Sequence, residues 1–208
     1  MTTAQTARPG IEPFPPGTDY FTALGLPCKL AIDRDDLERR YYDLSRRFHP
    51  DFFQTASSRE RLVSLENSAL VNKAYRTLRD PMDRAEYLVK LESGAGAEIP
   101  SQAPQALFEE ILELNELLSD YKLGDPEERR TLRAPLQEKE REFRAQYDAL
   151  HRRLTGDLFP RWDAAVDAGA AAEAEQRSLV AEISRIIGDR AYLRRVLSNL
   201  EEPLNSQR

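Results

Sequence analysis

Residues 33–51 read DRDDLERRYYDLSRRFHPD and contain an amphipathic helix with a sharp end. Asp33 is a suitable N-cap, and the acids that follow it lie in the first turn, where the helix dipole favours negative charge. Pro50 disfavours helical geometry at His49, so the tripeptide His49-Pro50-Asp51 is predicted to form an exposed loop. One narrow face of the helix carries the side chains that we expect to be buried: Leu37, Tyr41, Leu44 and Phe48.

The opposite face of this helix is basic. Its arginines are Arg39, Arg40, Arg46 and Arg47, and Asp43 is the one acid among them. Charge runs on helices are usually only solvated surface. The whole chain is acidic, however, with 30 Lys and Arg residues against 36 Asp and Glu residues. Arginines concentrated on one face of an acidic chain favour a docking site for an acidic protein surface.

The composition predicts an all-α fold, because the strand-forming residues Val, Ile and Thr are scarce. A second long helix is predicted at residues 58–78, and Asp80-Pro81 opens another one that runs to Leu91. Composition also sets the expected boundaries between segments. These are a disordered Pro-rich tail at residues 1–17, a helical domain at 18–93, and a Gly-, Ala-, Ser- and Pro-rich linker at 94–104.

The C-terminal half, residues 105–204, predicts a bundle of three helices, because short connections favour antiparallel neighbours. The expected elements are helices at 105–122 and 125–154 and a last helical region that ends near Pro203. Pro135 is expected to kink or split the second of these helices. Gly156 and Pro160 are expected to mark the turn that follows it.

The predicted helix at residues 105–122 has two distinct faces. One face forms the expected core of the bundle with Leu107, Ile111, Leu114, Leu117, Leu118 and Tyr121. The other face places Phe108 and Leu112 beside a row of acids, which are Glu109, Glu113, Glu116 and Asp120. Apolar anchors rimmed by charge are typical of a partner-binding patch. The alternative is that Phe108 packs under a neighbouring helix.

Several classes of function lack sequence support. Cys28 is the single cysteine and His49 and His151 are the two histidines, so we expect no metal and no cofactor. The acidic balance argues against a nucleic-acid partner. No apolar run reaches membrane-spanning length and the first residues lack a signal-peptide pattern, so we expect a cytoplasmic chain without a membrane partner. A hydrolase that uses His49, Asp51 or His151 would lack a nucleophile motif, and a purely structural adaptor would leave the His49 loop unexplained.

The order of motifs in the first half resembles the J domain. Residues 19–26 read DYFTALGL, the basic helix and the His49-Pro50-Asp51 loop follow, and residues 72–81 read NKAYRTLRDP. The resemblance implies that the loop and the basic helix engage a DnaK-type chaperone and trigger its ATP hydrolysis. The implied signalling residues are His49, Pro50 and Asp51, and the implied docking residues are Arg39, Arg40, Arg46 and Arg47. Phe52 is a departure, because many J domains place lysine after this tripeptide.

Further features of the sequence narrow the resemblance to one family of J proteins. The chain has neither the Gly/Phe-rich segment nor the CxxC repeats of general J co-chaperones, and DYFTALGLP (19–27) with RAEYL (84–88) looks like the HscB family. This resemblance implies a non-enzymatic co-chaperone that presents an IscU-type iron–sulfur scaffold protein to a DnaK- or HscA-type ATPase. The alternative is a J protein of the same mechanism with a different protein client. The implied scaffold-binding residues are Phe108, Leu112, Glu113, Glu116, Asp120 and Tyr192.

Overall fold

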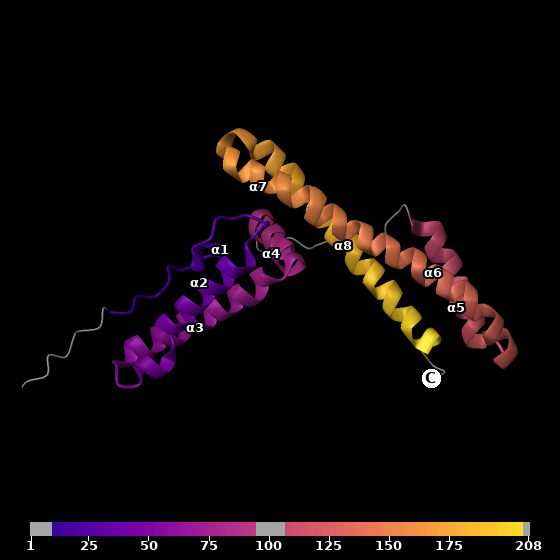
Figure 1. Ribbon diagram of the computed structural model, residues 1–208, viewed down its shortest axis with the longest axis horizontal. Helices are drawn as coiled ribbons and strands as arrows, with labels where there is room; N and C mark the ends of the chain where they lie inside the picture. Colours follow the sequence, from indigo (N-terminus) through magenta and orange to yellow (C-terminus); the bar gives the residue numbers. More distant parts are fainter. Residues whose placement is uncertain (1–9, 95–106, 206–208) are drawn as a thin grey trace, which may run out of the picture. The chain divides into compact units, whose positions relative to one another are not determined.

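The computed structural model describes residues 10–94 and 107–205, and every regular element in these ranges is helical, as expected from the composition. The chain divides into two compact units, Met1–Leu91 and Glu92–Arg208 (Figure 1). Most of the linker predicted at residues 94–104 lies outside the described residues. Each unit is therefore described by itself.

The first unit is built on an antiparallel pair of helices, α2 and α3, whose connection carries the HPD loop of His49, Pro50 and Asp51 (Figure 1). Its elements are α1 (Tyr20–Ala23), α2 (Arg34–Arg47), a single 3-10 turn η1 (Pro50–Phe53), α3 (Ser58–Arg79) and α4 (Pro81–Ser93). Helix α1 packs on α3. The predicted hairpin of two long helices is therefore present.

The ends of the two long helices are fixed by side-chain caps. Asp33 Oδ1 accepts a hydrogen bond from the backbone N–H of Asp36 at 2.8 Å, which starts α2. A capping box of Ser57 and Glu60 starts α3. The hydrogen bond from the Ser57 hydroxyl is the main cause that lowers the pKa of Glu60, so this cap keeps its charge over a wider pH range.

The predicted apolar face of α2 packs on α3. Leu37 and Phe48 are buried, with 2% and 5% of their surface exposed, and Tyr41 and Leu44 are half-buried. The Tyr41 ring stacks on Tyr75 of α3, with ring centroids 4.1 Å apart. Burial of this face holds the two helices together and turns the arginine face of α2 outward.

Residues 10–17, for which the sequence predicts a disordered tail, are held against α3 in the structure. Asn67 of α3 is buried, with 2% of its surface exposed, and its side chain hydrogen-bonds the backbone at Glu12 and Phe14. The prolines of this segment exclude a helix, but they leave these two backbone groups free to bond elsewhere. The segment is therefore held on α3 without secondary structure of its own.

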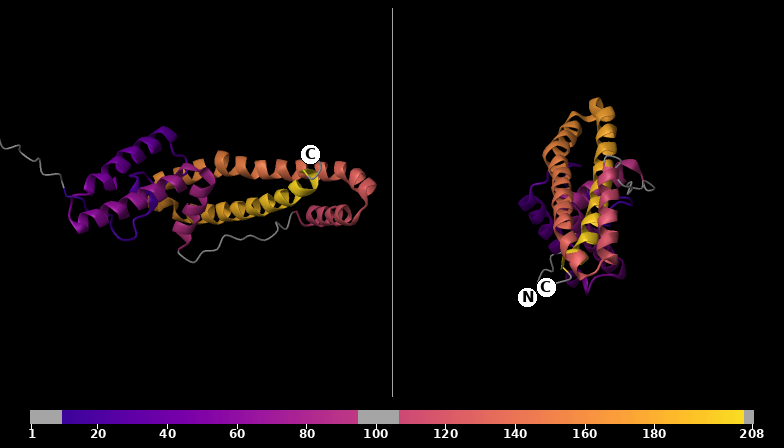
Figure 2. Two further views of the ribbon diagram at one scale, coloured as in Figure 1. Left: turned by 90° about the horizontal axis from the view of Figure 1, so that it is seen from below. Right: turned by 90° about the vertical axis from the view of Figure 1, so that its right-hand side faces the viewer.

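The second unit is an antiparallel helical bundle. Its elements are α5 (Phe108–Leu123), α6 (Pro126–Arg153), a π-helical turn η3 (Leu154–Leu158), α7 (Phe159–Ala168), a 3-10 turn η4 (Gly169–Ala172) and α8 (Glu173–Asn205). Helix α6 packs against both α5 and α8, and α6 and α8 lie side by side over much of their length (Figure 2). The expected three-helix bundle thus consists of α5, α6 and α8.

The turn predicted at Gly156 and Pro160 is wrong. The π-helical turn carries the chain from α6 directly into α7, and Pro160 lies in the first turn of α7. The chain reverses instead at Gly169, whose φ of +62° suits glycine. Pro135 likewise lies inside α6 and does not split the helix.

The core of the bundle confirms the predicted inner face of α5. Its buried members are Ile111, Leu114, Leu118, Leu136, Phe143, Leu193, Val196, Leu197 and Leu200. The other predicted core residues of α5 pack against this cluster and are half-buried, namely Leu107, Leu117 and Tyr121. The opposite side of α5 is left outside this core.

Candidate functional site

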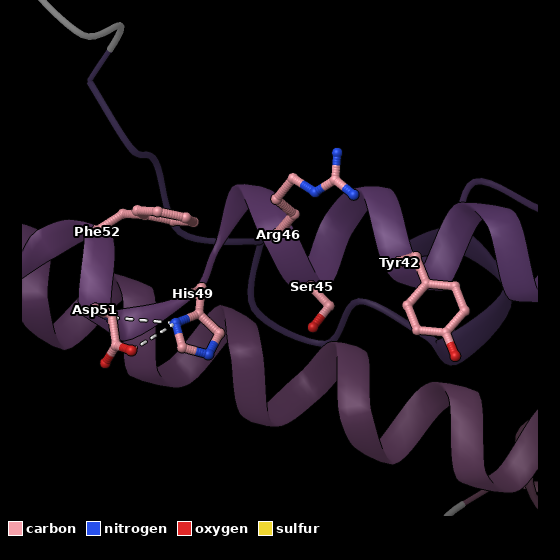
Figure 3. A pocket seen from close by; sticks show the side chains of 6 residues that line it. All are labelled: Tyr42, Ser45, Arg46, His49, Asp51 and Phe52. Carbon is pink, nitrogen blue, oxygen red and sulfur yellow. Dashed lines mark hydrogen bonds and ion pairs between the residues drawn. The ribbon is translucent and has the colours of Figure 1, made fainter.

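The HPD loop has the extended backbone that its proline imposes. His49 has φ −62° and ψ 125° and is the N-cap of η1, whose first residue is Pro50. The backbone N–H of Asp51 donates a hydrogen bond to His49 Nδ1 at 3.3 Å, and the Asp51 carboxylate lies 3.6 Å from the same nitrogen (Figure 3). The Asp51 N–H thus orients the imidazole, and the Asp51 carboxylate lies beside the ring at the tip of the loop.

This arrangement leaves polar groups for a partner. Because Nδ1 of the neutral imidazole accepts the Asp51 N–H, the ring proton lies on Nε2, which is a donor. About half of the His49 side chain is exposed, and 70% of the Asp51 side chain is exposed. The loop therefore presents a directional hydrogen-bond donor beside a charged acceptor.

An open depression on the surface lies beside the loop (Figure 3). It is lined by Tyr42, Ser45, Arg46, His49, Asp51 and Phe52. The rings of His49 and Phe52 meet edge to face, with centroids 5.9 Å apart, and Phe52 and Tyr42 remain at least half exposed. Sequence reasoning noted Phe52 only as a departure and missed Tyr42, whose signal was a second tyrosine next to the buried-face Tyr41.

The four predicted docking arginines fall into two pairs. Arg39 and Arg40 both form ion pairs with Asp36, one turn earlier on α2. Arg40 also donates from Nη1 to the carbonyl oxygen of Gly25, at 2.6 Å. This bond ties α2 to the end of α1, so the Arg40 guanidinium contributes to the fold of the first unit.

Arg46 and Arg47 form the other pair, at the C-terminal end of α2 next to the HPD loop. Both are exposed, and no carboxylate in the described ranges forms an ion pair with either. The Arg47 guanidinium lies over the Phe48 ring at 5.4 Å from its centroid, a cation–π distance. Two guanidinium groups without a carboxylate partner in the described ranges thus lie just before the histidine.

A second surface lies on α5. Phe108 is 64% exposed and Leu112 is 53% exposed, so Phe108 does not pack under a neighbouring helix. Glu109, Glu116 and Asp120 of the predicted acidic row are exposed beside them. The structure therefore brings apolar side chains and carboxylates together on this face, which we call the α5 face: Phe108, Glu109, Leu112, Glu113, Glu116 and Asp120.

Glu113 forms an ion pair within the bundle. Its carboxylate accepts a hydrogen bond from Nζ of Lys139 on α6, at 2.8 Å, and Glu142 lies 3.2 Å from the same ammonium. The hydrogen bond to Glu113 is the main cause that raises the pKa of Lys139 above its ordinary value. Glu113 still has 60% of its side chain exposed, so it can serve the bundle and a partner.

Tyr192 lies at the same level of the bundle as Phe108. The Tyr121 hydroxyl donates to the carbonyl oxygen of Pro203 at 2.9 Å, which sets the register of the parallel helices α5 and α8. At about 1.5 Å per residue, Phe108 lies about 20 Å before Tyr121 and Tyr192 about 16 Å before Pro203. Tyr192 is half-buried against the core, with Arg195 over its ring.

The sequence prediction missed one exposed apolar residue of α5. Leu123, the last residue of the helix, is 84% exposed. The helical repeat of 3.6 residues places it on the side of Phe108 and Leu112, so the apolar part of this side reaches the end of α5. The signal was available, since Leu123 continues the same wheel position beyond the predicted helix end at residue 122.

The described ranges hold neither a metal-binding cluster nor a membrane-spanning helix. Among residues 10–94 and 107–205, no cluster of three or more His, Cys, Asp and Glu side chains is placed to hold a metal ion. No helix within the same residues is both long enough and apolar enough to span a bilayer.

Known proteins resemble the chain in both units. Residues 19–87 match the family model of the DnaJ domain. The fold is similar to that of the chaperone HscB from Vibrio cholerae, with 28% sequence identity, 91% of this chain and 99% of that chain covered, and a TM-score of 0.54. It is also similar to human co-chaperone protein HscB, with 25% identity, 91% and 84% coverage, and a TM-score of 0.54.

Proposed function

We propose that this chain, which is a J-domain co-chaperone of the HscB type, stimulates ATP hydrolysis by a DnaK- or HscA-type chaperone and brings an IscU-type iron–sulfur scaffold protein to it. In this role the chain is not itself the enzyme, since ATP is hydrolysed by its partner. The observation that carries the proposal is the exposed HPD loop at the end of a basic helix.

The first unit supports the stimulating role through His49, Asp51, Arg46 and Arg47. The exposed arginines attract an acidic surface of the chaperone, which raises the rate of encounter more than the final affinity. The His49 Nε2–H and the Asp51 carboxylate then make directional hydrogen bonds to the chaperone in its hydrolysing conformation. A ligand shifts a conformational equilibrium only by binding one state better, so these hydrogen bonds must be stronger in that conformation.

The second unit supports the delivering role through the α5 face. Exposed phenylalanine and leucine side chains surrounded by acids suit a partner with an apolar patch and basic neighbours. Tyr192, at the level of Phe108, offers a further aromatic contact. A scaffold protein bound here is tethered to the loop that triggers the chaperone, so its local concentration near the chaperone rises.

The test is a steady-state ATPase assay with a purified DnaK- or HscA-type chaperone, the full chain and an IscU-type scaffold. We expect the chain alone to raise ATP turnover and the scaffold to raise it further. A chain that stimulates equally with an unrelated client and with the scaffold would support the alternative, a J protein with a different client. A chain without any effect on turnover would contradict the proposed function.

A further inference from the structure

The segment that precedes α1 is fastened to the J domain by a buried amide. Asn67 Nδ2 donates to the carbonyl oxygen of Glu12 at 2.9 Å, and Asn67 Oδ1 accepts from the backbone N–H of Phe14 at 3.1 Å. An asparagine with 2% of its surface exposed is costly unless its polar atoms are bonded. Here both ends of the amide are satisfied by a segment more than 50 residues away in sequence.

The same segment reaches the residue next to the HPD loop. The Phe14 ring meets the Phe48 ring edge to face, with centroids 5.5 Å apart and an angle of 69° between the planes. Phe48 is the C-cap of α2, and His49 follows it directly. Its carbonyl oxygen accepts a 2.8 Å hydrogen bond from the buried hydroxyl of Ser64 on α3. The residue before the histidine is thus held at its ring by Phe14 and at its backbone by Ser64.

We propose that Phe14, fastened by Asn67, is a positioning residue that holds the HPD loop in the conformation that engages the chaperone. This inference rests on the proposed function for its consequence, but its geometry concerns the free chain. Phe14 contacts Phe48, the residue that directly precedes the loop. It acts through Phe48, because the orientation of Phe48 sets the direction in which the chain enters the loop at His49.

The expected effect concerns affinity more than maximal stimulation. If the competent loop conformation is only partly populated, the apparent dissociation constant rises in inverse proportion to that population. Loss of one edge-to-face aromatic contact corresponds to a factor of about two to ten. Phe14→Ala is therefore expected to raise the half-saturating concentration in the ATPase assay about two- to tenfold. Maximal stimulation should stay unchanged, because the signalling groups remain.

The loop can be observed directly in the free full-length chain by NMR. The chain has two histidines, His49 and His151, so the imidazole region contains two sets of signals and His151, on α6, is an internal reference. In Phe14→Ala we expect the His49 ring signals and the Asp51 amide to shift while His151 stays in place. Phe14→Tyr keeps the ring and should restore both the His49 signals and the half-saturating concentration.

Glu12→Gln is the matched control in the same segment. It keeps the carbonyl that Asn67 holds and removes only a charge whose partner, Arg59, lies 3.9 Å away on the exposed surface, a contact of little energetic value. Its His49 signals should match those of the unmodified chain. If Phe14→Ala lowers only the melting temperature and leaves the His49 signals and the half-saturating concentration unchanged, the positioning role is refuted. If the unmodified chain does not stimulate the ATPase, the proposed function fails, and the imidazole spectrum alone decides on the positioning of the loop.

Discussion

The HPD loop and the α5 face differ in how they can recognise a partner. The loop presents two polar groups, the His49 ring and the Asp51 carboxylate, next to positive charge from Arg46 and Arg47. The α5 face presents the apolar Phe108 and its neighbours among negative charges. Directional hydrogen bonds concentrate the effect in a few atoms, whereas apolar burial scales with area.

This difference implies two partners of opposite surface charge. Under the proposed function, an acidic chaperone surface would complement α2 and a basic rim on the scaffold would complement α5, so neither partner would be drawn to the surface of the other. It also implies different sensitivities to mutation. Substitution of a polar side chain of the loop should abolish stimulation of the chaperone ATPase. Each truncation on the α5 face should instead lower the affinity for the scaffold by a further step. The following predictions test these differences, from the largest expected effect to the smallest.

The largest effect is expected at His49. His49→Gln should abolish stimulation of the chaperone ATPase, because glutamine cannot reproduce both the Nδ1 acceptor and the Nε2 donor geometry of the imidazole. Helical content, measured by circular dichroism, should not change, since the loop lies outside the core. The control is His151→Gln on α6, which should leave stimulation as it is. If His49→Gln stimulated the ATPase as strongly as His151→Gln does, the loop would have no special role in stimulation.

A large effect on scaffold binding is expected from truncation of the α5 face. Phe108→Ala combined with Leu112→Ala should weaken scaffold binding by about 2 kcal/mol or more for each anchor, measured by calorimetry. Both side chains are more than half exposed, so the melting temperature should change little. The matched control is Leu114→Ala on the core side of the same helix, which is 2% exposed. It should cost about 2–5 kcal/mol of folding stability.

A smaller effect is expected from reversal of the free arginines. Arg46→Glu with Arg47→Glu should weaken chaperone association about tenfold at low salt and flatten its salt dependence, because charges at the surface are screened within about 10 Å at 0.1 M salt. The control pair, Arg130→Glu with Arg152→Glu, makes the same change in net charge at exposed positions of α6. Identical binding curves for both pairs would show that only the net charge of the chain matters.

The smallest effect is expected at the ion pair between Glu113 and Lys139. Glu113→Gln should cost at most about 1 kcal/mol of folding stability at pH 7, because Glu113 is largely exposed. Glu113 raises the pKa of Lys139 above 10.5 in the folded chain. The stabilisation is therefore complete at neutral pH and is lost as the pH rises through that elevated pKa. The stability difference between the two chains should disappear at high pH in denaturant titrations, and a difference that persists there would contradict this assignment.

Local chemistry explains why much of both surfaces could be predicted. The backbone at His49 is set by the next residue, Pro50, so the loop needs no long-range information. The two sides of α5 follow from the helical repeat alone, which placed Leu114 inside and Phe108 outside. The chain reversal at Gly169 was harder, because buried leucines carry the helix through Gly156 and override its local preference.

The features that escaped prediction depend on contacts between distant residues. Asn67 gives no apolar signal on the α3 wheel, yet it fastens a segment more than 50 positions away. Arg40 belongs to the basic face by periodicity, but its guanidinium donates a hydrogen bond to the carbonyl oxygen of Gly25. Polar side chains find partners according to the packed fold, and a single sequence does not specify which distant backbone group will be nearby.

The most direct test of two separate surfaces is the ATP turnover of a DnaK- or HscA-type chaperone, measured with and without an IscU-type scaffold for three chains. The unmodified chain should stimulate turnover, and the scaffold should raise it further. The Phe108→Ala, Leu112→Ala chain should keep the first increase and lose the second, and His49→Gln should show neither. Stimulation by His49→Gln at the level of the unmodified chain, with or without scaffold, would contradict the account.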